Sequence, residues 1–572
     1  MWFLLSKVLR VTKRVKQKIY DKNRKRLIKK NIPYINETKN RCLARNVFPE
    51  NFFSDLIISI GHDKITSIAN EQIDNKYRVF GYDAIDFKTY KSLWYSDCIN
   101  GYTWPSNKYF RDTELRPENV CDIKVPWESA RLHHLCNYGL AYSITADEKY
   151  VLAGNEYLKN FIENNPFEQG INWFYSMEVS IRLINIILYA DLIERMGRKL
   201  PEQADLYMKG SIKHIMSNIE WRGGIRNNHY FVSLFGLNFA SFRFSENSYY
   251  KQIFKFSSKE IILETKFHIL PDGGGAELSS GYHQLNMEAL YLFYSVNKCT
   301  QNVKETLYGK LSFIFRHLMC PIELKLRRAS SADTIAANDL YHKGMHFLSS
   351  ISNENGQHPL IGDNDSGKII KVSPLGAEGR VSWANSLHFL NKKIKMKQKE
   401  SITETLSNVA DLSRLESFSL PSFEIIGELR GCKFDDFGLI TIQSDNILFT
   451  LKLHVDSKIP GHKHDDSLSI SLSYNAEWLF RDNGTYSYNV CRESYFNNKK
   501  KQSHTCSNVG EHHANDFSLE KNFNGYVIKY KGNTVYLFLI KNKMLRIYKD
   551  HNIKIVSGVY YPDYFVAGVK IY

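Results

Sequence analysis

The chain has 572 residues, enough for about two to four domains with a large buried core. Hydrophobic residues make up 43% and charged residues 24%, which excludes wholesale disorder, and no apolar run reaches the roughly 18 residues that a membrane-spanning helix requires. The net charge of +16 is concentrated near the N-terminus, so the rest of the chain is nearly neutral and a general nucleic-acid-binding surface is excluded.

The first predicted element is a basic segment over residues 1–40. Residues 1–30 contain twelve Lys and Arg side chains against one acidic residue, Asp21, a charge of +11. The apolar residues among them are Leu4, Leu5, Val8, Leu9 and Val15. They predict either a basic helix that lies on an anionic membrane surface or a frayed, solvated tail.

The expected location is the cytoplasm or the inner face of a membrane. The apolar run Met1–Leu5 is short and precedes the basic residues, which is the reverse of a secretory signal. The nine cysteines include no CxxC pair and no framework spacing, so we expect reduced thiols.

A helical domain is predicted over residues 41–415. Between about Val125 and Arg414, apolar residues recur at steps of three and four, which is typical of one face of a helix. One such stripe consists of Met177, Ile181, Ile184 and Leu188. Breaks such as Pro271–Gly275 separate the stripes. This pattern predicts antiparallel helical hairpins in a toroid or a solenoid, and the absence of a fixed repeat disfavours the solenoid.

An antiparallel β domain is predicted over residues 416–572. In the segment 468–473 Leu and Ile alternate with Ser, and in the segment 449–453 Phe and Leu alternate with Thr and Lys. Both patterns predict strands with one buried face. Gly532-Asn533 is expected to form a hairpin turn, and a second simple hairpin is expected through Asn475-Ala476.

Two segments of the helical domain concentrate polar chemistry. Asn227, Asn228 and His229 stand just before an apolar helix. They either cap that helix, since Asn is a strong N-cap, or supply donors that converge on an anion. Further along, Gly273–Gly275 suggests a tight turn or close approach to a ligand, but no lysine follows, which disfavours a nucleotide-binding loop. Tyr282 is either a packing residue or a general acid or base.

A third polar segment lies in the β domain. His462 and His464 are two residues apart and would share one face of an extended strand. Histidine pairs with nearby carboxylates are common metal ligands, and Asp482 follows at the end of the next strand. The simple hairpin sets Asp482 nearer to Ser469 than to His464, so the spacing is compatible with zinc without establishing it. The alternative is a polar cluster of histidines hydrogen-bonded to acidic residues.

Seven motifs, in this order along the chain, resemble those of the heparinase II/III and alginate-lyase polysaccharide lyases. They are DIKVPWESARLHHL from Asp122, NPFEQGINWFYSMEVSIRLIN from Asn165, NNHYFVSLFGL from Asn227, PDGGGAELSSGYH from Pro271, GDNDSGKI from Gly362, PGHKHDDSLSISL from Pro460 and DNGTYSYN from Asp482. The resemblance covers most of the chain from Asp122 onward. It implies an (α/α) toroid followed by an antiparallel β-sandwich.

The resemblance also implies roles for single residues. Asn228, with His229 beside it, would bind and neutralise the carboxylate of a uronate, and Tyr282 and His462 would be the catalytic tyrosine and histidine. The implied zinc ligands, which in the family look structural, are His464, Asp482 and His504.

The implied function is a lyase that cleaves an acidic, uronate-containing polysaccharide such as a glycosaminoglycan, alginate or bacterial capsule by β-elimination. Donors aimed at the carboxylate would stabilise the enolate-like charge. A base would remove the C5 proton, and an acid would protonate the departing O4.

Two other functions stay open. A glycoside hydrolase would use a carboxylate pair, with Glu277 and either Asp363 or Asp365 as candidates. A non-catalytic protein that binds glycan during capsule or O-antigen assembly is favoured by the basic N-terminus and by residues 497–506. These read NNKKKQSHTC, whereas members of the family usually read close to R-x-T-x-A-H-N-T.

Overall fold

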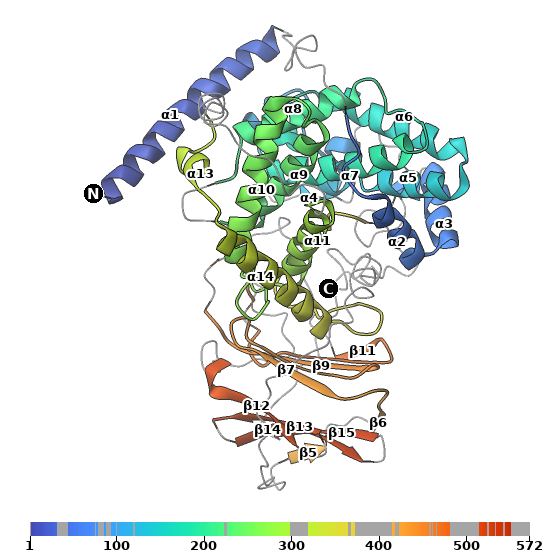
Figure 1. The fold of residues 1–572 in the computed structure, drawn as a ribbon, viewed down its shortest axis with the longest axis vertical. Coiled ribbons are helices and arrows are strands. Elements are labelled where there is room, and N and C mark those ends of the chain that lie inside the picture. The colour runs from blue at the N-terminus through green and yellow to red at the C-terminus, as the bar shows by residue number, and fades with distance from the viewer. Residues whose placement is uncertain are drawn as a thin grey trace.

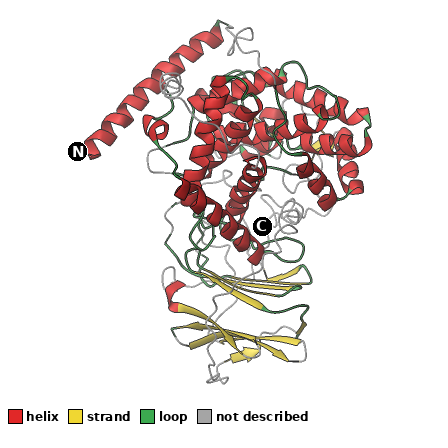
Figure 2. Ribbon diagram, in the orientation of Figure 1, coloured by secondary structure: helices red, strands yellow, loops and turns green. Residues whose placement is uncertain are grey.

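The computed structural model has a helical body followed by an antiparallel β-sandwich, which Figures 1 and 2 show one above the other. The described residues are 2–30, 44–74, 76–77, 85–86, 93–98, 100–117, 121–221, 226–297, 319–363, 368–371, 415–417, 422–456, 459, 462–464, 466–480, 514–522, 525–531, 533–541 and 544–550. The predicted fold class, an (α/α) toroid followed by an antiparallel β-sandwich, is confirmed. The candidate residues Asp365, Asp482 and His504 lie outside the described residues.

The helices begin earlier in the chain than the apolar periodicity indicated. They are α1 (Trp2–Lys29), α2 (Glu50–Ile60), α3 (His62–Ile73), α4 (Lys124–Ala130), α5 (His134–Thr145), α6 (Glu148–Asn164), α7 (Ser176–Glu194), α8 (Ala204–Ser217), α9 (Asn228–Arg243), α10 (Ser248–His268), α11 (Ser280–Asn297), α13 (Ile322–Leu326) and α14 (Ser331–Ser350). Helices α2 and α3 precede the periodic region that starts near Val125. Gly61, at φ +96°, separates them into two short helices, so neither carries a long apolar stripe.

The centre of the toroid is α7, which lies between α5 and α9. Every residue from Ser176 to Ile193 is buried, as expected for a helix that packs on all sides. Helix α9 approaches so closely that a Cβ atom on Gly236 would lie 2.5 Å from the backbone of Ser180. The outer helix α6 instead buries one face, so the toroid has an inner and an outer layer of helices.

Two antiparallel sheets form the β-sandwich. The strands among the described residues are β1 (Lys76–Tyr77), β2 (Ile85–Asp86), β3 (Ser96–Asp97), β4 (Tyr102–Thr103), β5 (Leu415–Ser417), β6 (Phe423–Glu424), β7 (Arg430–Phe434), β8 (Leu439–Gln443), β9 (Ile447–Lys452), β10 (Ile470–Tyr474), β11 (Glu477–Phe480), β12 (Phe517–Asn522), β13 (Gly525–Tyr530), β14 (Asn533–Lys541) and β15 (Met544–Asp550). One sheet has the order β11-β10-β9-β8-β7, and the other has the order β12-β13-β14-β15-β5 with β6 also paired to β15. The rings of Phe449 and Phe538 meet between the sheets at 4.9 Å.

The prediction that the strands at 449–453 and 468–473 have only one buried face is wrong. The serines of β10 are as buried as its apolar residues, and every residue of β9 is buried. The reason is that the toroid covers the second face of this sheet. The amide of Asn353 donates to Ser473 at 3.2 Å, and the ring of Phe347 contacts Phe434. Figure 1 shows α14 next to this sheet.

The two predicted hairpins differ in outcome. The turn through Asn475-Ala476 is confirmed, because Tyr474 pairs with Glu477 and both turn residues have positive φ angles of 49° and 63°. The antiparallel pairing of β13 with β14 confirms the other hairpin, but Tyr530 pairs with Asn533, so Asn533 belongs to strand β14 instead of to the turn. Gly532 lies outside the described residues. Among the described helices, none is both long and apolar enough to cross a membrane.

Candidate functional site

Three chain segments that are distant in sequence are joined by backbone hydrogen bonds. The N–H of Ser280, at the start of α11, donates to the carbonyl of Ile361, and the N–H of Asp363 donates to the carbonyl of His462, both at 2.9 Å. Gly362 lies between these two bonds at φ +69°. A Cβ atom there would lie 2.7 Å from the carbonyl oxygen of His462, so glycine permits this close approach.

The backbone connection places a tyrosine of the toroid against a histidine of the β-sandwich. The rings of Tyr282 and His462 are stacked with centroids 3.8 Å apart and an interplanar angle of 26°. Tyr282 is buried, whereas the side chain of His462 keeps 21% of its surface exposed. The two residues that the sequence predicted to be catalytic are therefore in direct contact, although 180 positions separate them in the chain.

One carboxylate holds both histidines of the GHKHDD motif. The side chain of Asp363 lies 3.2 Å from Nδ1 of His462 and 2.7 Å from Nε2 of His464. Burial alone would raise the pKa of Asp363, but the hydrogen bonds from the two histidines hold the pKa of that carboxyl well below its usual range. Asp363 is therefore an anion that fixes the orientation of both rings.

A second carboxylate joins His462 to Asn228. Glu277 accepts a hydrogen bond from the backbone N–H of Asn228 at 2.7 Å, and its other oxygen lies 3.6 Å from Nε2 of His462. Because Asn228 is the first residue of α9, the negative charge also lies at the positive end of a helix dipole. The capping interpretation of the asparagines is wrong: Asn227 is at the N-cap position, but its side chain makes no capping hydrogen bond.

The side-chain amide of Asn228 is buried without a hydrogen-bond partner among the described residues. Both Oδ1 and Nδ2 lack a partner, and the residue has no exposed surface. Leaving a buried polar group unpaired costs about 1–3 kcal/mol, so such a group in a functional site is suited to bind a ligand. The amide can both donate and accept.

His229 contacts a different pair of residues. Its Nδ1 lies 2.7 Å from a carboxylate oxygen of Glu220, and its ring packs edge-on against Tyr175 at 4.7 Å. Burial lowers the pKa of His229, but the carboxylate of Glu220 outweighs this effect and the pKa lies above its ordinary value. The ring of His229 therefore has its own carboxylate partner, one residue from Asn228.

The predicted zinc site is only partly within the described residues. Asp482 and His504 lie outside them, and His464 is buried against Asp363. The described part of the chain contains no group of three His, Cys, Asp or Glu side chains that could hold a metal ion. In metal-bound histidines the ring nitrogen that does not bind the metal usually donates to a carboxylate, so the Asp363–His464 contact fits the prediction without testing it.

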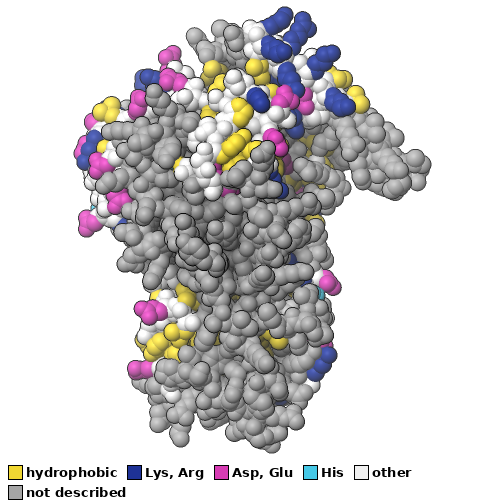
Figure 3. All heavy atoms as spheres, turned by 180° about the vertical axis from the view of Figure 1, so that it is seen from behind, with side chains coloured by type: hydrophobic (Ala, Val, Ile, Leu, Met, Phe, Trp, Pro, Cys, Tyr) yellow, Lys and Arg dark blue, Asp and Glu magenta, His cyan; other side chains and the backbone are white. Residues whose placement is uncertain are grey.

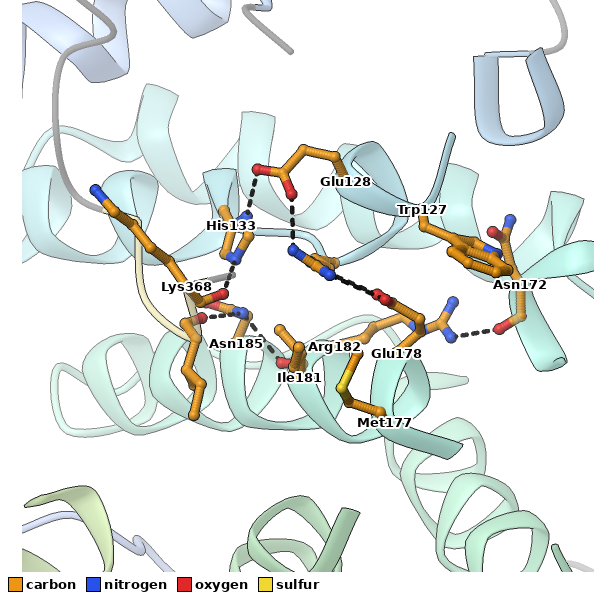
Figure 4. Close-up of polar contacts among 12 residues, drawn as sticks. Trp127, Glu128, His133, Asn172, Met177, Glu178, Ile181, Arg182, Asn185 and Lys368 are labelled. Carbon is orange, nitrogen blue, oxygen red and sulfur yellow. Dashed lines mark hydrogen bonds and ion pairs between the residues drawn. The ribbon is translucent and has the colours of Figure 1, made fainter. Parts of the chain in front are cut away.

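A buried ionic network connects α4 and α7 with the residues that follow the GDND motif (Figure 4). Arg131 binds Glu128 at 2.9 Å and Glu178 at 2.8 Å, and Nε2 of His133 lies 3.1 Å from the carbonyl of Lys368. Burial lowers the pKa of His133 to about 4, which keeps this ring neutral. The network fastens the chain beyond Asp363 to the toroid.

The sequence interpretation named Glu277 and Asp363 only as candidates for a hydrolase. Their contacts with Asn228, His462 and His464 were not foreseen. The sequence did contain a feature that could have indicated these contacts. Each carboxylate lies within a glycine-containing motif, PDGGGAE or GDND, where the backbone can approach other chain segments closely.

The chain matches the family model "Heparinase II/III N-terminus" over residues 5–323, which is more than half of its length. Its structure is similar to a crystal structure of heparinase III, with a TM-score of 0.50 and 14% identity over 86% of this chain and 70% of that one. It is also similar to heparan sulfate lyase HepC from Pedobacter heparinus, with a TM-score of 0.40 and 15% identity over 85% of this chain and 69% of that one. For an alginate lyase from Bacteroides ovatus the TM-score is 0.29 and the identity 12%, over 54% of this chain and 91% of that one. No curated protein sequence matches the chain. The likeness to heparinase III is one of fold, and it extends over both domains.

Proposed function

Because the chain belongs to the heparinase II/III family, we propose that it is a polysaccharide lyase that cleaves an acidic, uronate-containing polysaccharide by β-elimination. The observation that carries this proposal is the stacking of Tyr282 on His462 at 3.8 Å. Two groups that can exchange protons are thus adjacent, and Glu277 connects them to the backbone of Asn228. The side-chain amide of Asn228 has no hydrogen-bond partner among the described residues.

The proposed reaction starts at the carboxylate of the uronate. The proton on C5 is weakly acidic because its removal places more negative charge beside an existing anion. The buried amide of Asn228 would donate to the carboxylate and stabilise that charge as it develops, which is the principle of an oxyanion hole. His229, with its raised pKa, would add positive charge at the same helix end.

Proton transfer is assigned to Tyr282 and His462. One of them would take the proton from C5 and the other would supply a proton to the departing O4. The C5–H and C4–O4 bonds break, a C4=C5 double bond forms, and no water is consumed. Asp363 and Glu277 would act by positioning, since both contact the ring of His462.

The contacts of the carboxylates disfavour a glycoside hydrolase. Its general acid requires a carboxyl group with a raised pKa. The pKa of Asp363 is instead lowered by His462 and His464. Glu277, the other candidate among the described residues, is buried with one oxygen bound to the backbone of Asn228.

The proposal is tested by incubating the purified protein with glycosaminoglycans, alginate and bacterial capsular polysaccharides. A lyase raises the ultraviolet absorbance, because the new double bond is conjugated with the uronate carboxylate. Cleavage that yields only saturated ends would refute elimination and support hydrolysis. Glycan binding without cleavage of any polymer would instead support the non-catalytic function in surface-polysaccharide assembly.

We also propose that His464 is one ligand of a structural zinc ion, with Asp482 and His504. Two imidazoles and a carboxylate suit zinc, and a bound metal adds to the free energy of folding. We expect one zinc per chain by elemental analysis of protein purified without chelators, and its loss together with thermal stability in His464→Ala. Native protein without stoichiometric metal would remove this site while leaving Asn228, Tyr282 and His462 in their roles.

A further inference from the structure

Helix α1 extends from the toroid instead of being part of its layers. It spans Trp2–Lys29, about 42 Å at 1.5 Å per residue, and Figure 1 shows its N-terminal end pointing away from the body. With the neighbouring Lys30 it contains the twelve basic residues that give the N-terminus its charge of +11. Neither the toroid nor the proposed reaction accounts for a helix of this charge.

Side chains on one side of the C-terminal half of α1 hold it to the toroid. The guanidinium of Arg24 binds the buried carboxylate of Glu168 at 2.6 Å, and the hydroxyl of Tyr20 donates to the same carboxylate at 3.0 Å. Asp21, the residue after Tyr20, accepts a hydrogen bond from the hydroxyl of Tyr109 at 2.8 Å. These contacts determine which side of α1 faces away from the protein.

The outward side of α1 carries exposed apolar residues between basic ones. Val15 and Ile19 are 50% and 57% exposed, and Lys22 and Arg26 are exposed on the same side at steps of three and four residues. In the sequence, this spacing continues toward the N-terminus through Leu4, Val8 and Val11. Figure 3 shows Lys and Arg side chains gathered where the C-terminal end of α1 meets the toroid. We call Val15, Ile19, Lys22 and Arg26 the outward face.

We propose that the outward face of α1 binds an anionic lipid surface and holds the toroid there. A basic helix with an apolar stripe lies in the plane of a membrane interface, with its apolar side chains among the acyl chains and its cations at the anionic headgroups. Charge argues against a second copy of the chain as the occupant, because two segments of +11 repel each other. The polar contacts of Arg24 leave the outward face available while the helix stays attached.

Sedimentation of the full-length protein with vesicles tests the proposal. The vesicles contain either phosphatidylcholine alone or phosphatidylcholine with phosphatidylserine. We expect binding only to the second kind, with a decrease as salt is added. Lys22→Glu/Arg26→Glu should weaken binding at least about thirty-fold, since each basic residue near an anionic surface contributes about 1 kcal/mol. Val15→Gln/Ile19→Gln should weaken it at least about tenfold at unchanged charge.

A matched control carries the same change in charge elsewhere. Lys159→Glu/Lys199→Glu alters two exposed lysines of the toroid near α6 and should bind vesicles like the wild type. The proposal is overturned if the wild type does not bind anionic vesicles, or if the control is weakened as much as Lys22→Glu/Arg26→Glu. It is also overturned if Val15→Gln/Ile19→Gln changes the oligomeric state by light scattering and leaves vesicle binding intact. The variants should retain activity on soluble polysaccharide, so this test is independent of the proposed reaction.

Discussion

Single residues of the candidate site are connected in one chain of contacts. Asn228 is held through its backbone by Glu277, Glu277 approaches His462, and His462 stacks on Tyr282 and is held from its other nitrogen by Asp363. In Asn228 and Tyr282 these contacts involve the backbone N–H and the ring, respectively. The proposed reaction uses other atoms of these two residues, the side-chain amide of Asn228 and the hydroxyl of Tyr282.

The hydroxyl of Tyr282 can be removed with little change in shape. Tyr282→Phe keeps the ring that stacks on His462, so the protein should fold normally while kcat falls by about 10² to 10⁴-fold, the usual contribution of a general acid or base. The measurement is the initial rate at which the ultraviolet-absorbing product forms. Tyr294→Phe removes the same atom about 18 Å further along α11 and should leave the rate unchanged. Equal rates for Tyr282→Phe and the wild type would exclude Tyr282 from proton transfer.

Glu277 can be tested by two replacements of different severity. Glu277→Gln keeps an oxygen that can accept from the N–H of Asn228 and loses the charge that faces His462. Glu277→Ala loses both contacts. If Glu277 is a positioning residue, kcat should fall in the order wild type, Gln, Ala, by about 10²-fold for Ala, with Gln partly restoring the rate. Equal loss of kcat in Gln and Ala would indicate that the charge alone matters.

At the scale of elements, the site depends on where helices begin. Helix α9 begins at Asn228 and α11 begins at Ser280, so the functional groups lie in the first turns of two inner helices. The first turn of a helix has N–H groups without a partner in the helix and lies at the positive end of the helix dipole. Both features stabilise the carboxylate of Glu277 where it accepts from the backbone N–H of Asn228. Helix α1 differs, because a buried ion pair attaches it to the outside of the toroid.

The attachment of α1 should depend on pH through Glu168. Burial raises the pKa of Glu168, but His214 and Arg24 outweigh it and lower the pKa to about 2. A carboxyl whose pKa is lower in the folded state stabilises the protein above its unfolded pKa, and this stability is lost as pH falls through about 2. The lowering of the pKa of Glu168 from its ordinary value corresponds to about 3 kcal/mol in the free energy of folding.

Glu168→Gln should therefore lower the free energy of unfolding at pH 7 by about this amount, and the difference from the wild type should shrink as pH decreases from about 5 toward 2. Hydrogen exchange over residues 17–30 should become faster in the variant. The control is Glu163→Gln, which removes the charge of an exposed residue of α6. A difference from the wild type that does not vary with pH would contradict the role of Glu168.

At the scale of the whole molecule, the site exists only where the two domains meet. Tyr282 comes from the toroid and His462 from the β-sandwich, and the Gly362 segment connects them. A further contact holds the domains together, because Asp272 accepts a hydrogen bond from the N–H of Phe437 at 2.8 Å. The relative placement of the domains is thus part of the candidate active site.

Gly362→Ala tests this placement. An alanine Cβ would meet the carbonyls of His462 and Leu278 at 2.7 and 2.8 Å, so the β-sandwich loop must shift and activity should fall by about 10²-fold. Gly197→Ala is the matched control, because Gly197 has a similar φ of +77° and no neighbour within 4 Å of the added Cβ. Both variants should lose about 1 kcal/mol of stability from backbone strain, and only Gly362→Ala should lose activity. Equal activities of Gly362→Ala and Gly197→Ala would refute the role of the close approach between Gly362 and the carbonyl of His462.

The sequence by itself determined the order of the domains and the candidate catalytic groups. Apolar periods of three to four and of two depend on local geometry, and the motifs around Asn228, Tyr282 and His462 are continuous in the chain. Tertiary structure alone decided what surrounds these groups. The burial of the serines in β10, the two histidines on Asp363 and the link from Glu277 to Asn228 all join segments that lie far apart in the chain. A sequence pattern records which face of an element is apolar, but it does not record which second surface covers a polar face, and that contact sets the charge and orientation of the site.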